Sequence, residues 1–268
     1  MSTDTKLFVI GGMLALGLLS PLPAFSQSYS FKILGGNLQP NGINDKGVVV
    51  GQCCAPIQGF IVANGTVTNV IDPLDPTGNT ILYGINNDGV IVGTSDTRSF
   101  WLKDGVFHTI TDATSSVMLQ PEGINSKGAF AGWLTTKSGL FGFVYASKKI
   151  TPLASPVTSI NDSQDVVGTV LNSDVGYEIL GGVYSILSVP SSNYTYPAGI
   201  NDRETISGWY SDLNNYAHGF VLRNGAVTTI DYPGADFTRL GGINRFGQVV
   251  GFAIANGAVT GFEATPMP

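Results

Sequence analysis

The sequence predicts an all-β fold of six four-stranded antiparallel sheets, and three observations support this prediction. A Gly-Ile-Asn segment, followed by a turn and a β-branched run, occurs six times, once with Ser in place of Gly. A second segment, in which an aromatic residue follows Gly or Ser, occurs six times between those copies. Neither segment has the hydrophobic period of a helix. Because four-stranded propeller blades repeat every ~40 residues, the prediction is a six-bladed β-propeller.

The spacing of the Gly-Ile-Asn copies gives the blade length. Successive copies are separated by 42, 39, 36, 40 and 43 residues, with a mean of 40. The fourth copy departs most from the pattern, because Gln164-Asp165 stands where other copies have a turn Gly, and the fifth copy has Glu204 there. The copies begin at Gly42, Gly84, Gly123, Ser159, Gly199 and Gly242.

Each repeat is predicted to contain four strands, A to D. Strand A ends in Gly-Ile-Asn, strand B is the Val-rich run after the turn, and strand C is the aromatic segment. Strand D follows a two-residue turn. Four repeats carry turn pairs that accept positive φ at both central residues. These pairs are Asn64-Gly65, Asp104-Gly105, Gly181-Gly182 and Asn224-Gly225.

The two ends of the folded chain predict how the ring closes. The segment from Tyr29 to Leu34 resembles a strand D that lacks its own A, B and C. The last segment, from Gly261 to Ala264, is a strand C that lacks its D. We therefore expect the N-terminal strand to complete the last blade, which removes the open sheet edges.

The stretch HGFVLRNGAVTTIDYPGADFTRLGGINRFGQVVG, from His218 to Gly251, resembles the HAF-repeat proteins, a family of secreted bacterial proteins. The likeness covers nearly the whole chain after residue 26. It implies a propeller-like extracellular protein of unassigned activity. It implies no catalytic residues.

The N-terminal residues 1–26 are predicted to be a signal peptide. Lys6 precedes an apolar run from Leu7 to Leu19, and small residues flank Phe25. This run is shorter than the ~20 residues that span a bilayer, so no membrane span is expected after cleavage. We expect a secreted or periplasmic protein in which residues 27–268 form one domain.

Charge and cysteine content limit the partners and the cross-links. The net charge is −6 and there is no Lys/Arg run, so nucleic acid is not an expected partner. Cys53 and Cys54 are the two cysteines and are adjacent. Neighbouring Cα atoms lie ~3.8 Å apart, below the usual disulfide range of ~4.4–6.8 Å. A strained vicinal disulfide, two unbridged thiols and a linkage to another group all remain open.

The asparagine of each Gly-Ile-Asn segment is predicted to have a structural role. Six carboxamides at equivalent places could surround an axis, but Asn side chains readily bond the backbone two residues on and stabilise turns. The single carboxylates in these turns fall short of a calcium loop, and His108 and His218 make no metal-ligand spacing. No metal or cofactor is expected. The predicted turn residues are Asn44, Asn86, Asn125, Asn161, Asn201 and Asn244.

The variable connections, B to C and D to A, should share one face, and this face is the predicted binding surface. Its polar and Tyr-rich loops suit a glycan or an extracellular protein. Trp133 and Trp209 follow the last Gly of strand B, where they would either pack between blades or form a stacking platform. The predicted binding residues are Trp133, Tyr194, Tyr196, Trp209, Tyr210, Asp212, Tyr216, Tyr232, Asp236 and Arg239.

Three function hypotheses follow from this pattern. The first is a non-enzymatic binding or interaction protein. The second is an exported hydrolase or lyase that acts on a polysaccharide through carboxylates of the loops or of the central channel. It predicts paired carboxylates ~5–10 Å apart. The third is a structural protein of the cell surface or matrix. The sequence leaves the ligand and the oligomeric state open.

Overall fold

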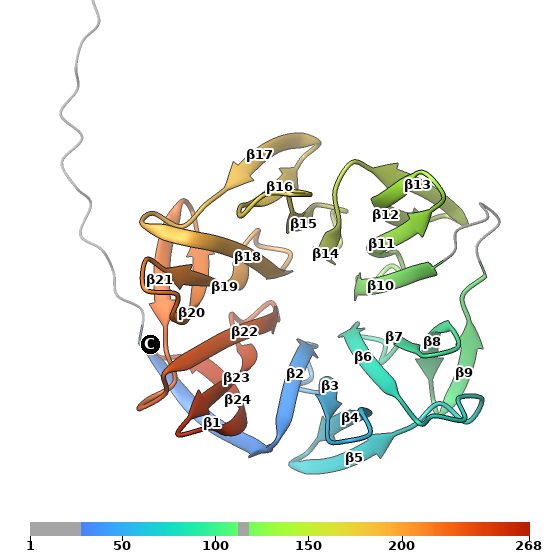
Figure 1. The fold of residues 1–268 in the computed structure, drawn as a ribbon, viewed down its shortest axis with the longest axis horizontal. Coiled ribbons are helices and arrows are strands. Elements are labelled where there is room, and N and C mark those ends of the chain that lie inside the picture. The colour runs from blue at the N-terminus through green and yellow to red at the C-terminus, as the bar shows by residue number, and fades with distance from the viewer. Residues whose placement is uncertain (1–27, 112–117) are drawn as a thin grey trace, which may run out of the picture.

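The computed structural model describes residues 28–111 and 118–268, and these form six four-stranded antiparallel sheets around a central channel (Figure 1). The six-bladed β-propeller predicted from the repeats is thereby confirmed. The described part of the chain contains no helix that is long and apolar enough to cross a membrane. The predicted signal peptide lies outside the described residues.

Each blade places strand A beside the channel, and strand B pairs with it. The A strands are β2 (Leu38–Ile43), β6 (Thr80–Ile85), β10 (Met118–Ile124), β14 (Val157–Ile160), β18 (Ser192–Ile200) and β22 (Phe237–Ile243). The B strands are β3 (Val49–Cys53), β7 (Ile91–Ser95), β11 (Phe130–Thr136), β15 (Val166–Thr169), β19 (Ile206–Asp212) and β23 (Val249–Ala255).

The C and D strands form the outer half of each blade. The C strands are β4 (Gln58–Ala63), β8 (Ser99–Lys103), β12 (Gly139–Ala146), β16 (Gly176–Leu180), β20 (Ala217–Arg223) and β24 (Ala258–Pro266). The D strands are β5 (Thr66–Val70), β9 (Val106–Thr109), β13 (Lys149–Leu153), β17 (Val183–Leu187), β21 (Ala226–Ile230) and, for the sixth blade, β1 (Tyr29–Gly36).

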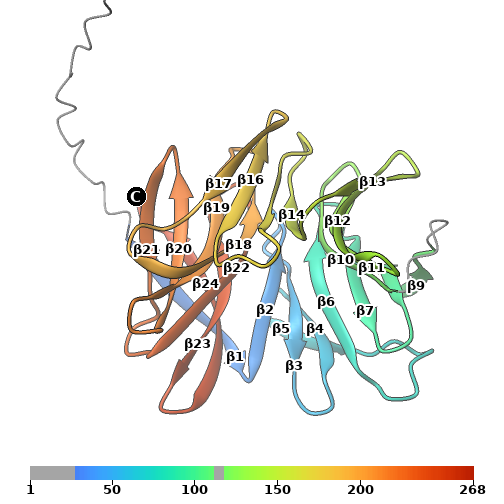
Figure 2. The ribbon, with the colours of Figure 1, turned by 45° about the horizontal axis from the view of Figure 1, so that its top comes forward.

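The ring closes as the sequence predicts. The N-terminal strand β1 pairs antiparallel with β24, so that Tyr29 lies opposite Pro266 and Ile33 opposite Phe262. Figures 1 and 2 show the blue N-terminal strand against the red C-terminal blade. Because the last sheet takes its outer strand from the other end of the chain, unfolding of either end opens the ring.

The core lies between neighbouring blades. One aromatic side chain of each strand C is 0–1% exposed. The clusters cross from blade to blade: Val250 of the sixth blade packs with Phe60 of the first, and Val50 of the first with Phe100 of the second. Burying one such side chain contributes about 1.5–3 kcal/mol. The six aromatics are Phe60, Phe100, Phe143, Tyr177, Phe220 and Phe262.

The first residue of Gly-Ile-Asn is a glycine because neighbouring A strands almost touch around the channel. A Cβ atom on Gly123 would lie 2.8 Å from the Cα atom of Ser159, and one on Gly42 would lie 2.9 Å from the carbonyl oxygen of Tyr83. Both neighbours are backbone atoms, so they have little room to shift. The narrow channel therefore depends on these glycines.

The turns divide the molecule into two ends. A-to-B corners and C-to-D hairpins lie at one end, and the B-to-C and D-to-A connections form the opposite face, hereafter the loop face. The hairpins at Asn64-Gly65 and Asp104-Gly105 have positive φ at both residues, as predicted. The third blade makes the same turn with Ser147 and Lys148, at φ of 52° and 62°, without a glycine.

Candidate functional site

The six asparagines at the A-to-B corners close into a hydrogen-bonded ring, hereafter the asparagine ring. Each side chain is buried, and its Nδ2 donates to the backbone oxygen of the equivalent Asn in the next blade at 2.9–3.3 Å. Each Oδ1 also accepts from its own turn; for Asn125 the donors are Lys127 N at 3.1 Å and Ala129 N at 2.9 Å. Every side chain of the ring thus uses both its nitrogen and its oxygen in hydrogen bonds within the chain.

Carboxylates beside the asparagine ring also accept hydrogen bonds from the backbone of a neighbouring blade. Asp45 Oδ1 accepts from Arg245 N at 2.9 Å, and Asp162 Oδ1 accepts from Ser126 N at 2.7 Å. Asp202 Oδ1 accepts from Asp162 N at 2.8 Å. Among residues 28–111 and 118–268, no three His, Cys, Asp or Glu side chains gather closely enough to hold a metal ion. This end of the channel therefore joins the blades.

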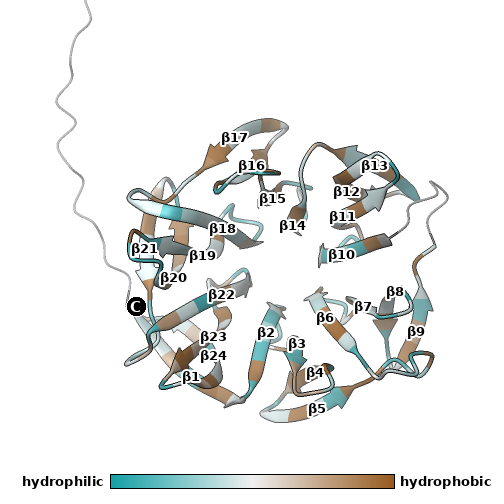
Figure 3. Cartoon of the chain, in the orientation of Figure 1, coloured by the Kyte–Doolittle hydropathy of each residue, from teal (hydrophilic) through white to brown (hydrophobic). Residues whose placement is uncertain are grey.

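The opposite end of the channel opens into a cavity of about 360 Å³ on the loop face, hereafter the mouth cavity. It is lined by residues of the A strands and the B strands. Hydrophilic residues stand beside hydrophobic ones along inner strands such as β2 and β10 (Figure 3). The lining residues on which the argument depends are Gln52, Tyr83, Glu122, Tyr196, Trp209 and Arg239.

A β-bulge in each blade lies at the position before Gly-Ile-Asn, on the channel wall. The A-to-B register skips a residue between Leu82 and Gly84, and another between Pro121 and Gly123. The first, fourth and fifth blades have the same irregularity, and in the sixth blade the register shifts between Leu240 and Ile243. Bulges re-aim side chains next to functional sites. The residues before the six segments are Asn41, Tyr83, Glu122, Thr158, Ala198 and Gly241, and all six line the mouth cavity.

An aromatic cluster from the fifth blade borders the mouth cavity, and two of its members, Tyr196 and Trp209, line it. The ring centroids of Tyr194 and Tyr196 lie 5.1 and 5.5 Å from that of Trp209. The guanidinium of Arg239, on β22 of the next blade, lies 3.8 Å from the Trp209 ring centroid and 4.7 Å from that of Phe237. The two rings hold the guanidinium in place.

Two polar atoms of the mouth cavity lack a partner. In the part of the chain that the structure describes, two buried side-chain nitrogen or oxygen atoms make no hydrogen bond, namely Arg239 Nε and Gln52 Oε1. Both residues line the mouth cavity. Burial lowers the pKa of Arg239, although Tyr194 and Tyr196 act in the opposite direction. The wall of the cavity therefore contains one unmet donor and one unmet acceptor, both buried.

Glu122 faces this cavity from the bulge of β10. Burial raises its pKa to about 7, although hydrogen bonds from Gln120 Nε2 at 2.6 Å and Trp133 Nε1 at 3.1 Å favour the charged form. Burial also raises the pKa of Tyr83 to about 12 and raises that of Tyr196. The two phenols are therefore uncharged at neutral pH, while Glu122 is partly protonated.

A second cavity, of about 470 Å³, adjoins the first between the third and fourth blades. It shares Glu122 and Tyr196 with the mouth cavity and is also lined by Trp133 and Leu140. Strands β14 and β15 have four residues each, whereas β10 and β11 have seven. The short strands of the fourth blade leave this gap beside Trp133.

Five of the ten predicted binding residues lie at or beside the mouth cavity. Tyr194, Tyr196, Trp209 and Arg239 lie together in the aromatic cluster, and Trp133 reaches the cavity through Glu122. Trp133 and Trp209 are both half-buried, so neither is a core residue nor a freely exposed platform.

The other five predicted binding residues lie elsewhere. Tyr232 packs against Phe31 and Phe262, and Tyr210 stacks on His218. Asp212 Oδ1 accepts from the backbone of Asn214 and Tyr216 and so caps its own turn. Tyr216 and Asp236 are exposed, and neither lines the mouth cavity.

Sequence reasoning missed Glu122, Tyr83 and Gln52. A signal was present, because the residue before Gly-Ile-Asn varies from blade to blade while its neighbours repeat. Six equivalent positions that face one channel and carry different residues indicate a site with its own chemistry. Which way these side chains face depends on the bulge, and the bulge has no signature in the sequence.

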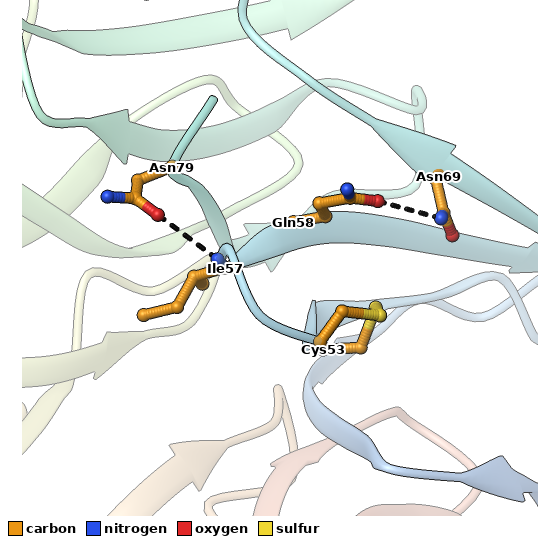
Figure 4. The surroundings of a disulfide bond; sticks show 6 residues. Cys53, Ile57, Gln58, Asn69 and Asn79 are labelled. Atoms are coloured by element: carbon orange, nitrogen blue, oxygen red, sulfur yellow. Dashed lines mark hydrogen bonds between the residues drawn. A yellow bond between two sulfur atoms is a disulfide. The ribbon is translucent and has the colours of Figure 1, made fainter. Parts of the chain in front are cut away.

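Other parts of the loop face are held by a disulfide and by an ion pair. Cys53 and Cys54 form a vicinal disulfide in the B-to-C connection of the first blade (Figure 4). Asp72 is fully buried and paired with Arg98, whose Nη2 lies 2.6 Å from Asp72 Oδ1. Burial acts to raise the pKa of Asp72, but hydrogen bonds from Arg98, Leu74 and Ser95 hold it below its usual value. This buried ion pair joins the D-to-A connection that contains Asp72 to the B-to-C connection that contains Arg98.

Comparison with known proteins supports the fold. No protein-family model and no curated protein matches the chain, so the resemblance to HAF-repeat proteins stays a prediction. Among solved structures, YCF48 bound to a D1 peptide has a TM-score of 0.52 at 10% identity, and the match covers 90% of this chain and 97% of that one.

Two further solved structures are similar. A mutant of AofleA from Arthrobotrys oligospora has a TM-score of 0.51 at 12% identity, and the match covers 89% of this chain and 86% of that one. TolB from Acinetobacter baumannii has a TM-score of 0.52 at 10% identity, with 77% of this chain and 59% of that one covered. At these identities the likeness shows a shared propeller architecture.

Proposed function

We propose that the protein is a non-enzymatic binding propeller that holds one end of a glycan in the mouth cavity. The observation that carries this proposal is the pair of unpartnered atoms, Arg239 Nε and Gln52 Oε1, in one cavity. A buried polar group without a partner costs about 1–3 kcal/mol. A ligand that supplies both a donor and an acceptor recovers that cost.

Sugar hydroxyls fit this requirement, because each one both donates and accepts a hydrogen bond. The cavity volume of about 360 Å³ lies within the range of small-ligand sites. Trp209 and Tyr196 supply aromatic contact area. Export and membership of the HAF-repeat family remain predictions, and both agree with an extracellular glycan as the ligand.

The proposal is tested by a glycan array probed with residues 27–268 and with two variants. We expect the wild type to bind a subset of glycans, and Gln52→Leu to lose that binding because it removes the unmet acceptor. Tyr216→Ala is the matched control, because Tyr216 is 55% exposed on the same face outside the cavity. Absence of glycan binding, or equal binding by Gln52→Leu, contradicts the proposal.

A polysaccharide lyase is the second candidate, and Glu122 is the observation that favours it. A carboxyl group with a pKa near 7 in a cavity suits a general base or acid. Glu122 is the single carboxylate among the described residues that line the two cavities, so the pair required for hydrolysis is not found there. Time-dependent appearance of unsaturated sugar ends, abolished by Glu122→Gln, would favour the lyase.

A further inference from the structure

Arg239 differs from the arginines and the lysine that pair with a carboxylate in the described chain. Arg98, Arg245 and Lys32 each have an Asp or Glu oxygen within 4.0 Å, at 2.6, 3.4 and 3.5 Å. Within the described chain, Arg239 makes no such pair and its Nε has no hydrogen-bond partner, although the residue is half-buried and its guanidinium lies over the rings of Trp209 and Phe237. A guanidinium held in this way keeps its charge with no counter-ion.

The neighbours of Arg239 in the mouth cavity do not neutralise it. Tyr194 and Tyr196 have pKa values raised by burial and are uncharged. Glu122 already accepts hydrogen bonds from Gln120 and Trp133, and its pKa near 7 leaves it partly protonated. The mouth cavity thus contains an uncompensated cation in a protein of net charge −6.

We propose that the bound glycan is acidic and that its sugar carboxylate binds the Arg239 guanidinium, an inference that rests on the proposed function. A planar guanidinium presents parallel N–H donors that match a carboxylate, and stacking on Trp209 fixes their plane. A single cation balances a monoanion, whereas a phosphate ester carries a charge of about −1.5 to −2. A ring hydroxyl of the same sugar donates to Gln52 Oε1.

The test is a calorimetric titration of an oligogalacturonide and of its neutral methyl ester into residues 27–268. We expect the wild type to bind the acid at least about tenfold more tightly than the ester. Arg239→Gln should lose about tenfold for the acid and leave the ester unchanged. The affinity of Arg239→Lys for the acid should lie between those of the wild type and Arg239→Gln, since lysine keeps the charge but not the planar donors.

The control variant is Arg223→Gln, because Arg223 is exposed at the end of β20 outside the mouth cavity. It should bind like the wild type, and the melting temperature of Arg239→Gln should be no lower than that of the wild type. Equal binding of the acid and the ester overturns the acidic-sugar inference and leaves the proposed function standing.

Further arms of the titration separate the remaining outcomes. A sulfated sugar that binds more tightly than the uronate overturns the choice of carboxylate. Binding of a peptide carboxylate, with no glycan bound, overturns both the inference and the proposed function. Failure of every acidic glycan, with neutral glycans bound on the array, overturns the inference alone.

Discussion

The two ends of strand β22 carry opposite kinds of polar side chain. Asn244, the residue directly after one end, donates to Asn44 O at 3.2 Å and accepts from Phe246 N and Gln248 N at 3.0 and 3.1 Å. Arg239, at the other end, has a buried Nε with no partner. At one end of the channel the side chains form hydrogen bonds within the chain, and at the other a buried donor has no partner.

This difference separates stability from binding along a single strand. Repeated residues at the asparagine ring satisfy one another, because each blade presents the same donor and acceptor to the next. Unrepeated residues at the mouth cavity cannot satisfy one another by symmetry. We therefore expect substitutions at the asparagine ring to change the free energy of unfolding, and substitutions at the mouth cavity to change affinity.

The largest effect is expected at the asparagine ring. Asn125→Ala removes the donor to Asn161 O and the acceptor for Lys127 N and Ala129 N. Leaving such groups without partners should lower the free energy of unfolding by about 4 kcal/mol. Denaturant titration measures it, with the exposed Asn69→Ala as the control. Asn125→Asp keeps the acceptor but removes the donor to Asn161 O. If Asn125→Asp lowers the free energy of unfolding no more than Asn69→Ala does, the hydrogen bond between the blades does not stabilise the protein.

A smaller loss is expected from Gly123→Ala, which tests the close approach of the A strands. The new Cβ would lie 2.8 Å from the Cα atom of Ser159. Overpacking of this kind should lower the free energy of unfolding by about 1–3 kcal/mol. Gly36→Ala is the control, because its Cβ would meet its nearest neighbour at 3.9 Å. Equal stability of both variants would show that the channel can widen freely.

The pH dependence of stability should report Glu122. Its pKa of about 7 in the folded protein exceeds the ordinary glutamate value of 4.5 expected in the unfolded chain, so the folded state holds the proton more tightly. The free energy of unfolding should therefore fall as pH rises from about 4.5 to about 7, by at most about 3 kcal/mol before screening. Glu122→Gln should flatten this slope, and Glu178→Gln should retain it. A slope unchanged by Glu122→Gln would show that burial does not perturb this carboxyl.

The smallest effect is expected from Trp133→Phe, which removes the indole donor to Glu122. That hydrogen bond favours the carboxylate, so its loss should raise the pKa of Glu122 further, by up to about one unit. Titration of the Glu122 carboxyl by nuclear magnetic resonance measures the shift. A lowered pKa would mean that the ring of Trp133 contributes mainly by excluding water.

The fold was predictable because one strand pattern occurs six times, which gives the number of blades and the order of their strands. The incomplete repeats at the two ends of the chain indicated how the ring closes. The third hairpin was not predictable from turn residues, since Ser147 and Lys148 adopt positive φ without Asn or Gly. The site was only half predictable. The residue types of Tyr196 and Arg239 indicated a binding role. Glu122 faces the cavity because of a bulge, and its pKa is raised by burial. Neither the bulge nor the burial can be inferred from the residues of a single strand.

The most direct test pairs Arg239→Gln, in strand β22, with Asn244→Ala, directly after that strand, and measures both the free energy of unfolding and the affinity for an acidic oligosaccharide. We predict that Asn244→Ala loses several kcal/mol of stability yet binds normally at a temperature where it is folded. Arg239→Gln should keep its stability and lose about tenfold in affinity. Equal losses of affinity in both variants, or a loss of stability in Arg239→Gln alone, would contradict the division between the asparagine ring and the mouth cavity.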